Sequence, residues 1–577
     1  MHTFEVWAPN ATKVEVTVHG KLIPLLAGDR GYWSVQVNDA QPGDDYAYVL
    51  DSQNPPLPDP RSPFQPSGVH AASRLVDHST FHWTDSNWQA PPLSSAIIYE
   101  LHIGTFTLGG TFDSAIEKLD DLRKLGITHV EVMPVNEFPG SRGWGYDGVD
   151  LYAPHHAYGG PDGLKRLVNA CHEKGLAILL DVVYNHLGPS GNYLSRFAPY
   201  FNPNYHTPWG AAVNLDGPGS TEVRRFFCDN ALMWLRDYHF DGLRIDAVHA
   251  FLDRSAIHFL EQLAAEVDAL EAQSGRHLVL IAESDLNQPL VVTSRAVHGY
   301  GIDAQWSDDF HHALHALSTG ERSGYYADFG SLSQLVKSLK SVFVYDGIYS
   351  RYRERNHGRP VLGLSSTRFL GYLQNHDQIG NRARGERSSH LLTLGRLKIA
   401  AALVLLSPFV PLLFQGEEFG ASSPFQYFTD HEDPGIGNAV TEGRRNEFAS
   451  FGWSPEDIPD PQSPETFERS KLNWNEAGEE PHRTMLEWHR QLIQLRRSYP
   501  ELTDGDLDCV AVHTDEARHL LALTRGSFTV VCNFNSSPNS YDVSKRSKII
   551  LSSEHDIGLV GSLLSLPPES VAVLQSA

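Results

Sequence analysis

Cysteine is scarce in this sequence of 577 residues, which contains only four. Cys171, Cys228, Cys509 and Cys532 lie far apart, and none belongs to a CxxC pair. This spacing gives no indication of a disulfide framework or of a cysteine metal site, so we expect reduced thiols.

Secretory and membrane-spanning segments are also missing from the pattern. The first residues show no basic start followed by an apolar core, as a secretory signal would. The longest apolar candidate, around residues 399–410, is too short to cross a bilayer and contains Ser407 and Pro408. We therefore predict a cytoplasmic protein with no membrane partner.

Positive charge is in short supply. The chain has 46 Lys and Arg against 70 Asp and Glu, which gives a formal net charge of −24. This charge would repel polyanions, so nucleic acid is not an expected partner, whereas a neutral ligand such as a sugar is compatible with it. With 41% hydrophobic residues and no long biased tract, the chain is expected to be globular.

The hydrophobic pattern divides the chain into three parts. Residues 3–50 alternate apolar and polar positions, which predicts a small β-sandwich, and short alternating strands return near the C-terminus. The Pro-rich stretch 55–66 is interpreted as a loop or linker. We predict an N-terminal β-sandwich at 1–90, a catalytic domain at 91–500 and a C-terminal all-β domain at 501–577.

In the middle part, apolar runs alternate with amphipathic segments, which is typical of the α/β class and of a (β/α)₈ TIM barrel. A helix after a Ser114–Glu117 capping box and another at 251–270 are among the predicted connections. The segment 185–220 is too long for an ordinary loop, and we expect it to be functional. The eight predicted strands are 97–106, 129–135, 176–183, 241–246, 277–283, 302–306, 369–374 and 410–415.

Four carboxylates lie near the C-terminal ends of predicted strands of this barrel, where such enzymes carry their active sites: Asp181, Asp246, Glu283 and Asp377. Arg244 lies two residues before Asp246, so both side chains point to the same face of the strand. An arginine there favours the ionised form of the carboxylate. A structural ion pair is the plainer alternative for these two residues taken alone.

Clustered carboxylates without a basic nucleophile suit a reaction with a cationic transition state, such as glycosidic cleavage. Asp246 would be the nucleophile. Glu283, on a neighbouring strand with no arginine expected beside it, would be the general acid and base. We expect their carboxyl groups at the short separation of retaining enzymes, about 5 to 5.5 Å. His186 and His376 would bond sugar hydroxyls, and Asp377 would hold the hydroxyls next to the reacting carbon.

Four segments, 181–186, 242–247, 282–284 and 375–378, resemble in order the four short regions of the alpha-amylase superfamily, glycoside hydrolase family 13. The resemblance implies that Asp246, Glu283 and Asp377 are nucleophile, acid/base and transition-state stabiliser. It also implies that four residues support the sugar or the nucleophile, namely Asp181, His186, Arg244 and His376. It extends over the whole chain, because members of this type carry an N-terminal β-sandwich similar to a carbohydrate-binding module and a C-terminal β domain.

Within the superfamily, residues 303–312 and 378–382 resemble the trehalohydrolases. This resemblance implies hydrolysis of the α-1,4 bond next to a terminal trehalose, and a companion synthase that makes the trehalose-ended substrate. Tyr146 is expected to stack on the reacting sugar, with a core tyrosine as the alternative. The candidates for binding the trehalose side are Trp306, Asp308 and Asp309, and weaker candidates in the long loop are Asn214 and Asp216.

Other functions stay open at this point. A glucan branching enzyme and a general α-amylase share several of the same motifs. A metal-dependent hydrolase is disfavoured because Arg244 would repel a cation, and a binding-only protein is disfavoured because no catalytic carboxylate is missing. His311 and His315 have the spacing of a metal pair but lack an HExxH context, so we interpret them as hydrogen-bonded histidines. No metal and no cofactor are predicted.

Overall fold

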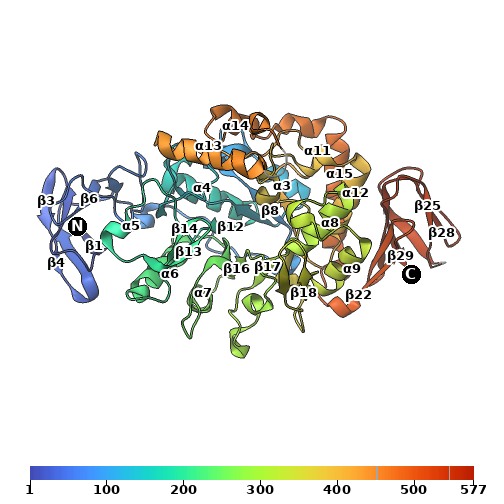
Figure 1. Cartoon of the computed structure of the whole chain (residues 1–577), viewed down its shortest axis with the longest axis horizontal. Helices are drawn as coiled ribbons and strands as arrows, with labels where there is room; N and C mark the ends of the chain where they lie inside the picture. Colours follow the sequence, from blue (N-terminus) through green and yellow to red (C-terminus); the bar gives the residue numbers. More distant parts are fainter. Residues whose placement is uncertain (450–452, 545, 577) are drawn as a thin grey trace.

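Eight parallel strands close into a barrel at the centre of the chain (Figure 1). This computed structural model describes residues 1–449, 453–544 and 546–576. The barrel strands, in spatial order, are β8 (Ile98–Leu101), β9 (His129–Val132), β12 (Ala177–Val182), β15 (Gly242–Ile245), β16 (Val279–Ala282), β17 (Ala304–Trp306), β20 (Phe369–Gly371) and β21 (Val410–Phe414). The predicted (β/α)₈ barrel and its eight strands are confirmed, although most strands are shorter than their apolar runs.

Helices pack around these strands, so every barrel residue is buried on both sides, and the strands have continuous apolar runs rather than alternation. After β16 the described chain has only the short 3-10 turns η6 (Pro289–Val292) and η7 (Arg295–Val297) before β17. The main surrounding helices are α3 (Leu119–Leu125), α4 (Gly160–Glu173), α6 (Ser220–Arg236), α7 (Phe259–Ser274), α8 (Asp308–Thr319), α9 (Leu332–Ser341), α12 (Leu394–Leu405) and α15 (His482–Ser498).

Two predicted helix starts are wrong. The Ser114–Glu117 capping box does not form, because the box consists of Thr111 and Ser114 and begins the earlier helix α2 (Phe112–Ile116). The helix predicted at 251–270 begins only at Phe259. Before it, the carboxylate of Asp253 accepts the backbone N–H of Phe259 at 2.7 Å and pairs with Arg224, which holds residues 251–258 as a loop.

The long segment 185–220 has its own secondary structure. It contains the short helix α5 (Leu194–Phe197) and a hairpin formed by β13 (Phe201–Thr207) and β14 (Gly210–Val213). Trp209 lies in the turn of this hairpin. The segment therefore projects a structured arm over the barrel instead of a loose loop.

The N-terminal sheets form a sandwich at one end of the molecule (Figure 1). One sheet contains β1 (His2–Trp7), β4 (Leu26–Ala27) and β5 (Tyr32–Val37); the other contains β2 (Val14–Val18), β3 (Lys21–Pro24), β6 (Asp45–Leu50) and β7 (Ser73–Arg74). Phe4 of the first sheet packs on Tyr46 of the second, with ring centroids 5.0 Å apart. Alternating apolar residues thus fill the space between two sheets.

Two further sheets lie at the opposite end (Figure 1). The larger has β22 (Val510–Asp515), β23 (Leu520–Arg525), β24 (Phe528–Asn533), β26 (Ser547–Ser552) and β29 (Ser570–Ser576); the smaller has β25 (Asn539–Asp542), β27 (Gly558–Val560) and β28 (Leu563–Leu566). Their facing sides share one apolar cluster that includes Leu520, Leu564 and Leu574. The domain limits at 90 and 500 stay predictions.

None of the helices among the described residues combines the length and the apolar character that a membrane span requires. All four cysteines are free thiols, and Cys509 is the exposed one.

Candidate active site

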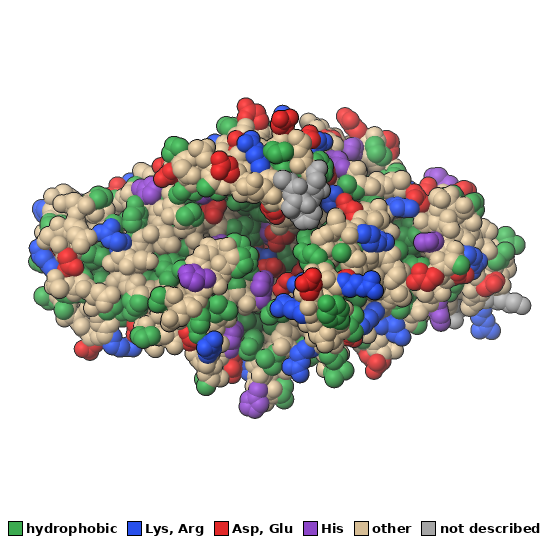
Figure 2. All heavy atoms as spheres, viewed as in Figure 1, with side chains coloured by type: hydrophobic (Ala, Val, Ile, Leu, Met, Phe, Trp, Pro, Cys, Tyr) green, Lys and Arg blue, Asp and Glu red, His purple; other side chains and the backbone are tan. Residues whose placement is uncertain are grey.

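A cavity of about 630 Å³ opens where the carboxyl ends of the barrel strands meet. Figure 2 shows it as a hollow near the middle of this face, with acidic side chains inside. Asp246, Glu283 and Asp377 all line it. The three predicted catalytic carboxylates are therefore brought into one cavity from three separate stretches of sequence.

Asp246 follows β15 directly and is held by two donors. Arg244 Nη1 donates to Asp246 Oδ1 at 2.8 Å, and Asn185 Nδ2 donates to Asp246 Oδ2 at 2.7 Å. Both donors stabilise the anionic form of the carboxylate. The predicted common orientation of Arg244 and Asp246 is confirmed, and Asn185 is a partner that the sequence interpretation missed although it lies within one of the matched motifs.

Arg244 is fully buried and connects several acids. Its Nη1 donates to both oxygens of Asp181 at 2.8 Å, and its guanidinium lies over the ring of Trp306 at 4.3 Å. Its Nη2 also lies 3.4 Å from Glu283 Oε2. The expectation that Glu283 has no arginine beside it is therefore wrong, because the neighbouring strand supplies one.

Glu283 nevertheless has a pKa well above its ordinary value. Burial is the largest cause, the Arg244 charge opposes it, and the charges of Asp246 and Asp377 raise it further. The backbone N–H of Ala247 donates to Glu283 Oε2 at 2.5 Å, which leaves Oε1 to carry the proton. Ala247 itself has φ of 40°, a strained value for a residue with a Cβ, and this conformation turns its N–H toward Glu283.

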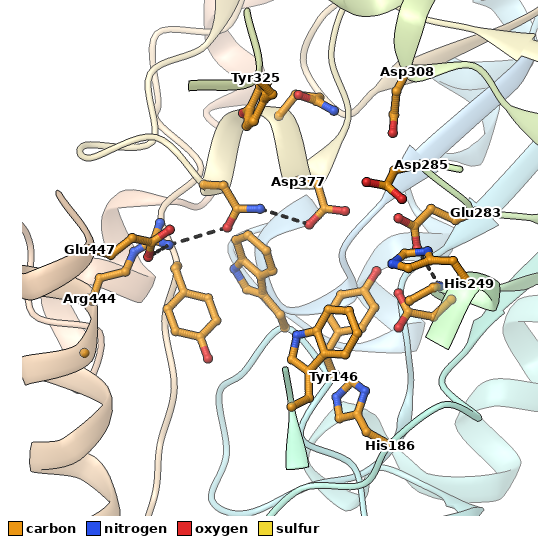
Figure 3. Close-up of a pocket in the computed structure, with 18 of the residues that line it drawn as sticks. Tyr146, His186, His249, Glu283, Asp285, Asp308, Tyr325, Asp377, Arg444 and Glu447 are labelled. Carbon is orange, nitrogen blue, oxygen red and sulfur yellow. Dashed lines mark hydrogen bonds and ion pairs between the residues drawn. The ribbon is translucent and has the colours of Figure 1, made fainter. Parts of the chain in front are cut away.

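Asp377 lies in the first turn of α10 (His376–Gly380), whose N-cap is Asn375. Asn381 Nδ2 donates to Asp377 Oδ1 at 3.3 Å, and Arg444 Nη1 lies 3.4 Å from Asn381 Oδ1 (Figure 3). Arg444 belongs to α13 (Pro434–Ala449), which forms one wall of the cavity. Helix α13 thus supports the short helix α10, which carries Asp377.

Tyr146 and His186 both line the cavity, as predicted. The hydroxyl of Tyr146 donates to Asp181 Oδ2 at 2.5 Å and lies 2.7 Å from His376 Nε2. The ring of His186 stacks on Trp209, with centroids 5.4 Å apart. Asp181, Arg244 and His376 lie behind this wall, where they contact the lining residues rather than the open space.

Besides the three residues behind the wall, four further candidate binding residues do not line the cavity, which corrects their predicted placement. His376, predicted to bond sugar hydroxyls, does not line the cavity either. Trp306 packs inside the barrel beneath Arg244. Asp309 accepts the backbone N–H groups of Val344 and Tyr345 and is buried. In the long loop, Asn214 bonds local backbone groups, and Asp216 accepts from Asn202 and Tyr205. The polar groups of Asp309, Asn214 and Asp216 are thus bonded to nearby backbone or side-chain groups. Asp308 does line the cavity.

Several lining residues were missed by the sequence interpretation. Arg353 Nη1 pairs with Asp285 Oδ2 at 3.0 Å on the wall near Glu283, and Figure 3 shows Asp285 and Asp308 above Glu283. Trp209, on the arm, is 47% exposed and faces the same space. Two signals for these residues were present in the sequence. The length of segment 185–220 pointed to the region of Trp209, and Asp285 lies only two residues after Glu283. The other missed residues include Trp144, His249, His312, Tyr325, Asn381, Tyr427 and Arg444.

Several candidate metal-donor groups among the described residues contact one another or nearby side chains. His311 Nε2 lies 2.8 Å from the Tyr326 hydroxyl and His315 Nε2 lies 2.7 Å from Glu321, so these histidines are hydrogen-bonded as predicted. Glu137, His155 and His156 have donor atoms within 4.8 Å of one another. In that group, His156 Nδ1 lies 2.6 Å from Glu137 Oε1, a hydrogen-bond distance.

Comparisons with known proteins place this geometry in a family. The model of the alpha-amylase catalytic domain matches residues 76–206. Malto-oligosyltrehalose trehalohydrolases from Rhizobium sp. (strain M-11) and Arthrobacter ramosus are 48% and 51% identical, over 99% and 93% of this chain and 97% and 93% of their own lengths. The enzyme of that name from Saccharolobus solfataricus is 47% identical over 86% of this chain and 85% of its own length.

Solved structures agree with the fold. A Salmonella typhimurium protein assigned provisionally as an alpha amylase superposes with a TM-score of 0.91 at 37% identity, over all of this chain and 97% of its own. A pullulanase from Anoxybacillus sp. LM18-11 superposes with a TM-score of 0.73 at 20% identity, over all of this chain and 86% of its own. By contrast, a branching enzyme from Pseudoalteromonas atlantica is 35% identical over only 43% of this chain and 38% of its own length.

Proposed function

The chain belongs to the malto-oligosyltrehalose trehalohydrolases of the alpha-amylase family, and we propose that it hydrolyses the α-1,4 bond next to the terminal trehalose of a malto-oligosyltrehalose. The products are trehalose and a shortened maltodextrin. The observation that supports this most directly is the shared cavity of Asp246 and Glu283, in which Arg244 contacts both carboxylates.

The first chemical step follows from the two environments. Asp246, held by Arg244 and Asn185, attacks the anomeric carbon while Glu283 Oε1 gives its proton to the departing glycosidic oxygen. The bond to the trehalose oxygen breaks and a bond to Asp246 forms. Burial raises the pKa of Glu283 well above its ordinary value, which favours the protonated form that this step requires.

In the second step, Glu283 accepts a proton from water, which attacks the same carbon and releases Asp246. Two displacements at one carbon keep the α configuration. Asp377, placed beside the cavity by Asn381, would accept hydrogen bonds from sugar hydroxyls and favour a distorted ring. The face of Tyr146 and the indole of Trp209 supply apolar platforms for the glucose units.

The trehalose side of the cavity is assigned to the wall next to the proton donor. Asp285, Asp308 and Arg353 line that wall and offer charged acceptors and donors to sugar hydroxyls. Since the leaving group departs from the side of the general acid, these residues replace Trp306 and Asp309 as the binding candidates. We also expect the enzyme to act in the cytoplasm, on a substrate made by a companion synthase. No residue of the cavity bears on the location or on the synthase.

One assay tests the proposal. Maltoheptaose and a trehalose-ended chain of the same length are incubated separately with the enzyme, and the products are separated and quantified. Free trehalose from the second substrate alone is the expected result, and NMR taken at early times should show the new reducing end as the α anomer. New α-1,6 branches would instead identify a branching enzyme, and maltose from both substrates would identify a general amylase.

A further inference from the structure

Two buried acids of the barrel have no part in the chemistry described so far. Glu100 of β8 and Glu131 of β9 are direct partners in the parallel register, and each is 1% exposed. Parallel neighbours lie about 4.8 Å apart, so two carboxyl groups of one barrel layer meet here. An ordinary barrel layer is filled with branched apolar residues, which makes a pair of acids in this position unusual.

The two acids have opposite environments. Glu100 accepts hydrogen bonds at both oxygens, from the His376 backbone N–H to Oε2 at 3.0 Å and from His376 Nδ1 to Oε1. Both oxygens of Glu131 are buried without any hydrogen-bond donor. A carboxylate buried in this way is strongly destabilised, whereas its neutral form is tolerated. The negative charge of the pair therefore resides on Glu100.

The charge on Glu100 determines which way the neighbouring hydrogen bonds run. The Tyr146 hydroxyl lies between His376 Nε2 at 2.7 Å and Asp181 Oδ2 at 2.5 Å. Asp181 already accepts Arg244 at both oxygens, as an ionised carboxylate does, so Tyr146 must donate to it. Tyr146 has only one hydrogen, and His376 Nε2 must then donate to its oxygen. Because His376 Nδ1 also donates, to Glu100, the ring is an imidazolium.

We propose that Glu100 and Glu131 form an acid pair with a single negative charge, and that this charge fixes the hydrogen bonds that run from His376 through Tyr146, Asp181 and Arg244 to Asp246. Both are positioning residues, since neither lines the cavity. The inference rests on the proposed function for the role of Asp246 as nucleophile. It identifies what holds the wall of the reacting subsite in one orientation before substrate arrives.

The surroundings of His376 are consistent with this assignment. Burial by itself would lower the pKa of His376, but Asp377 and Glu100 raise it to about 9. Burial and the charge of Glu100 raise the pKa of Glu131 well above its ordinary value. The other titratable or charged groups that face His376 come from the neighbouring elements: His102, Tyr146, Asp181, Arg244 and Asp377.

The test compares Glu100→Gln with Glu131→Gln, using α-maltosyl fluoride as substrate. Fluoride leaves without protonation, so loss of the proton from Glu283 does not lower kcat at high pH. The alkaline limb of the kcat–pH profile should then report the deprotonation of His376. For E100Q we expect kcat to fall about tenfold or more and the alkaline limb to move at least about one pH unit lower. For E131Q, which replaces one neutral group by another, the limb should stay where the wild-type protein has it.

Two results would overturn the proposal: an alkaline limb that moves as far in E131Q as in E100Q, or one that does not move in E100Q. If E100Q does not fold, NMR of the wild-type protein labelled with [ε1-¹³C]histidine still tests the charge of His376. The variant His376→Asn assigns the resonance. An imidazolium signal for residue 376 at pH 7.5 supports the pair, and a neutral ring excludes it. Failure of the trehalose assay with intact fluoride hydrolysis would instead count against the proposed function alone.

Discussion

Two carboxylates of similar chemistry acquire different roles here through the groups beside them. Asp246 accepts from two side-chain donors at 2.7–2.8 Å, whereas Glu283 accepts one backbone N–H, lies 3.4 Å from Arg244 Nη2 and faces the charges of Asp246 and Asp377. Close donors stabilise an anion, and neighbouring negative charges favour a proton. The assignment of nucleophile and acid follows from this contrast rather than from residue type.

The first prediction concerns these two groups. Asp246→Asn should lower kcat by more than about 10⁴-fold, because the covalent step is lost. Glu283→Gln should lower kcat on the trehalose-ended substrate by about 10²–10⁴-fold but spare α-maltosyl fluoride in the first step, because fluoride needs no acid. Circular dichroism and thermal unfolding control for the fold. Turnover close to wild type in either variant would refute the assigned roles.

At the scale of elements, the arm formed by β13 and β14 and the helix α13 supply walls that the barrel itself lacks. Trp209 reaches the cavity from the arm, and Arg444 reaches it from α13. Arg444 donates to the carbonyl of Gly380 and so ties α13 to the C-terminal end of α10, the short helix that carries Asp377. The barrel supplies the acids, and these added elements supply the shape of the groove.

The second prediction tests the arm. Trp209→Ala should raise KM for the trehalose-ended substrate about five- to tenfold with a smaller change in kcat, because a stacking face worth about 1–1.5 kcal/mol is removed. Trp209→Phe keeps a ring and should recover most of the loss. Steady-state kinetics of the two variants measure KM and kcat separately and so show whether the aromatic ring itself contributes to binding. An unchanged KM in Trp209→Ala would show that the arm does not touch the sugar.

A buried charge cluster at the start of β15 connects several elements at the other end of the barrel. Asp241 Oδ2 accepts the Ile178 backbone N–H at 2.9 Å and lies 3.0 Å from His172 Nε2 of α4. Asp241 Oδ1 accepts from Trp88 at 2.9 Å. His172 also contacts Asp85 at 2.8 Å. One carboxylate therefore joins a helix, a strand and the segment before the barrel.

The third prediction is that Asp241→Asn lowers the free energy of unfolding by about 3–5 kcal/mol, since it removes the buried charged partner that His172 and Arg276 share. Asp120→Asn, at an exposed ion pair with Lys174, is the matched control and should change it by less than about 1 kcal/mol. Urea denaturation measures both. Equal effects would show that the cluster contributes nothing beyond a surface pair.

The same cluster predicts a pH dependence. Burial would lower the pKa of His172, but hydrogen bonds to Asp241 and Asp85 raise it above 6.5, so its contribution is complete below pH 6.5 and is lost as the pH rises through the raised value. Burial would raise the pKa of Asp241, but His172 lowers it below 3.8, so its contribution is lost only in acid. In Asp241→Asn the loss of stability above pH 6.5 should be smaller than in the wild-type protein.

At the scale of the whole molecule, the C-terminal sheets are joined to the barrel by buried cations that bond carbonyl groups. Arg525 of β23 is 3% exposed and donates to the carbonyls of Ser407 and Leu502 at 2.7 Å. Arg496 of α15 donates to the Ser407 carbonyl at 2.9 Å. Ser407 precedes β21, at the end of the barrel away from the cavity, so this junction stabilises the catalytic part without touching substrate.

The fourth prediction follows from that junction. Arg525→Met should lower the free energy of unfolding by about 2–4 kcal/mol, because buried carbonyl groups lose a charged donor, and should leave kcat at 25 °C as it is. Arg518→Met, at an exposed pair with Asp515 of the same domain, is the control. Urea midpoints and initial rates check the two statements. A large loss of kcat with unchanged stability would contradict them.

Much of this protein follows from its sequence, for physical reasons that particular residues illustrate. The strand period and the helix period are local properties, so the alternation of elements predicts the barrel and its eight strands. Asp246, Glu283 and Asp377 could be identified because the carboxyl ends of barrel strands converge, wherever those strands lie in the chain. Two helix starts could not be predicted, since the side chains of Thr111 and Asp253 accept the backbone N–H groups at the observed starts, and several nearby residues could cap a helix equally well.

Only the tertiary structure decided which polar residues face the cavity. Trp306 and Asp309 flank Asp308 in sequence, yet the first turns into the barrel and the second toward a backbone loop, because the strand ends and the helix begins between them. Trp209 and Arg353 reach the site across many intervening residues, and no local pattern signals such a contact. The partnership of Glu100 with Glu131 likewise depends on the register of two strands, which sequence periodicity leaves open.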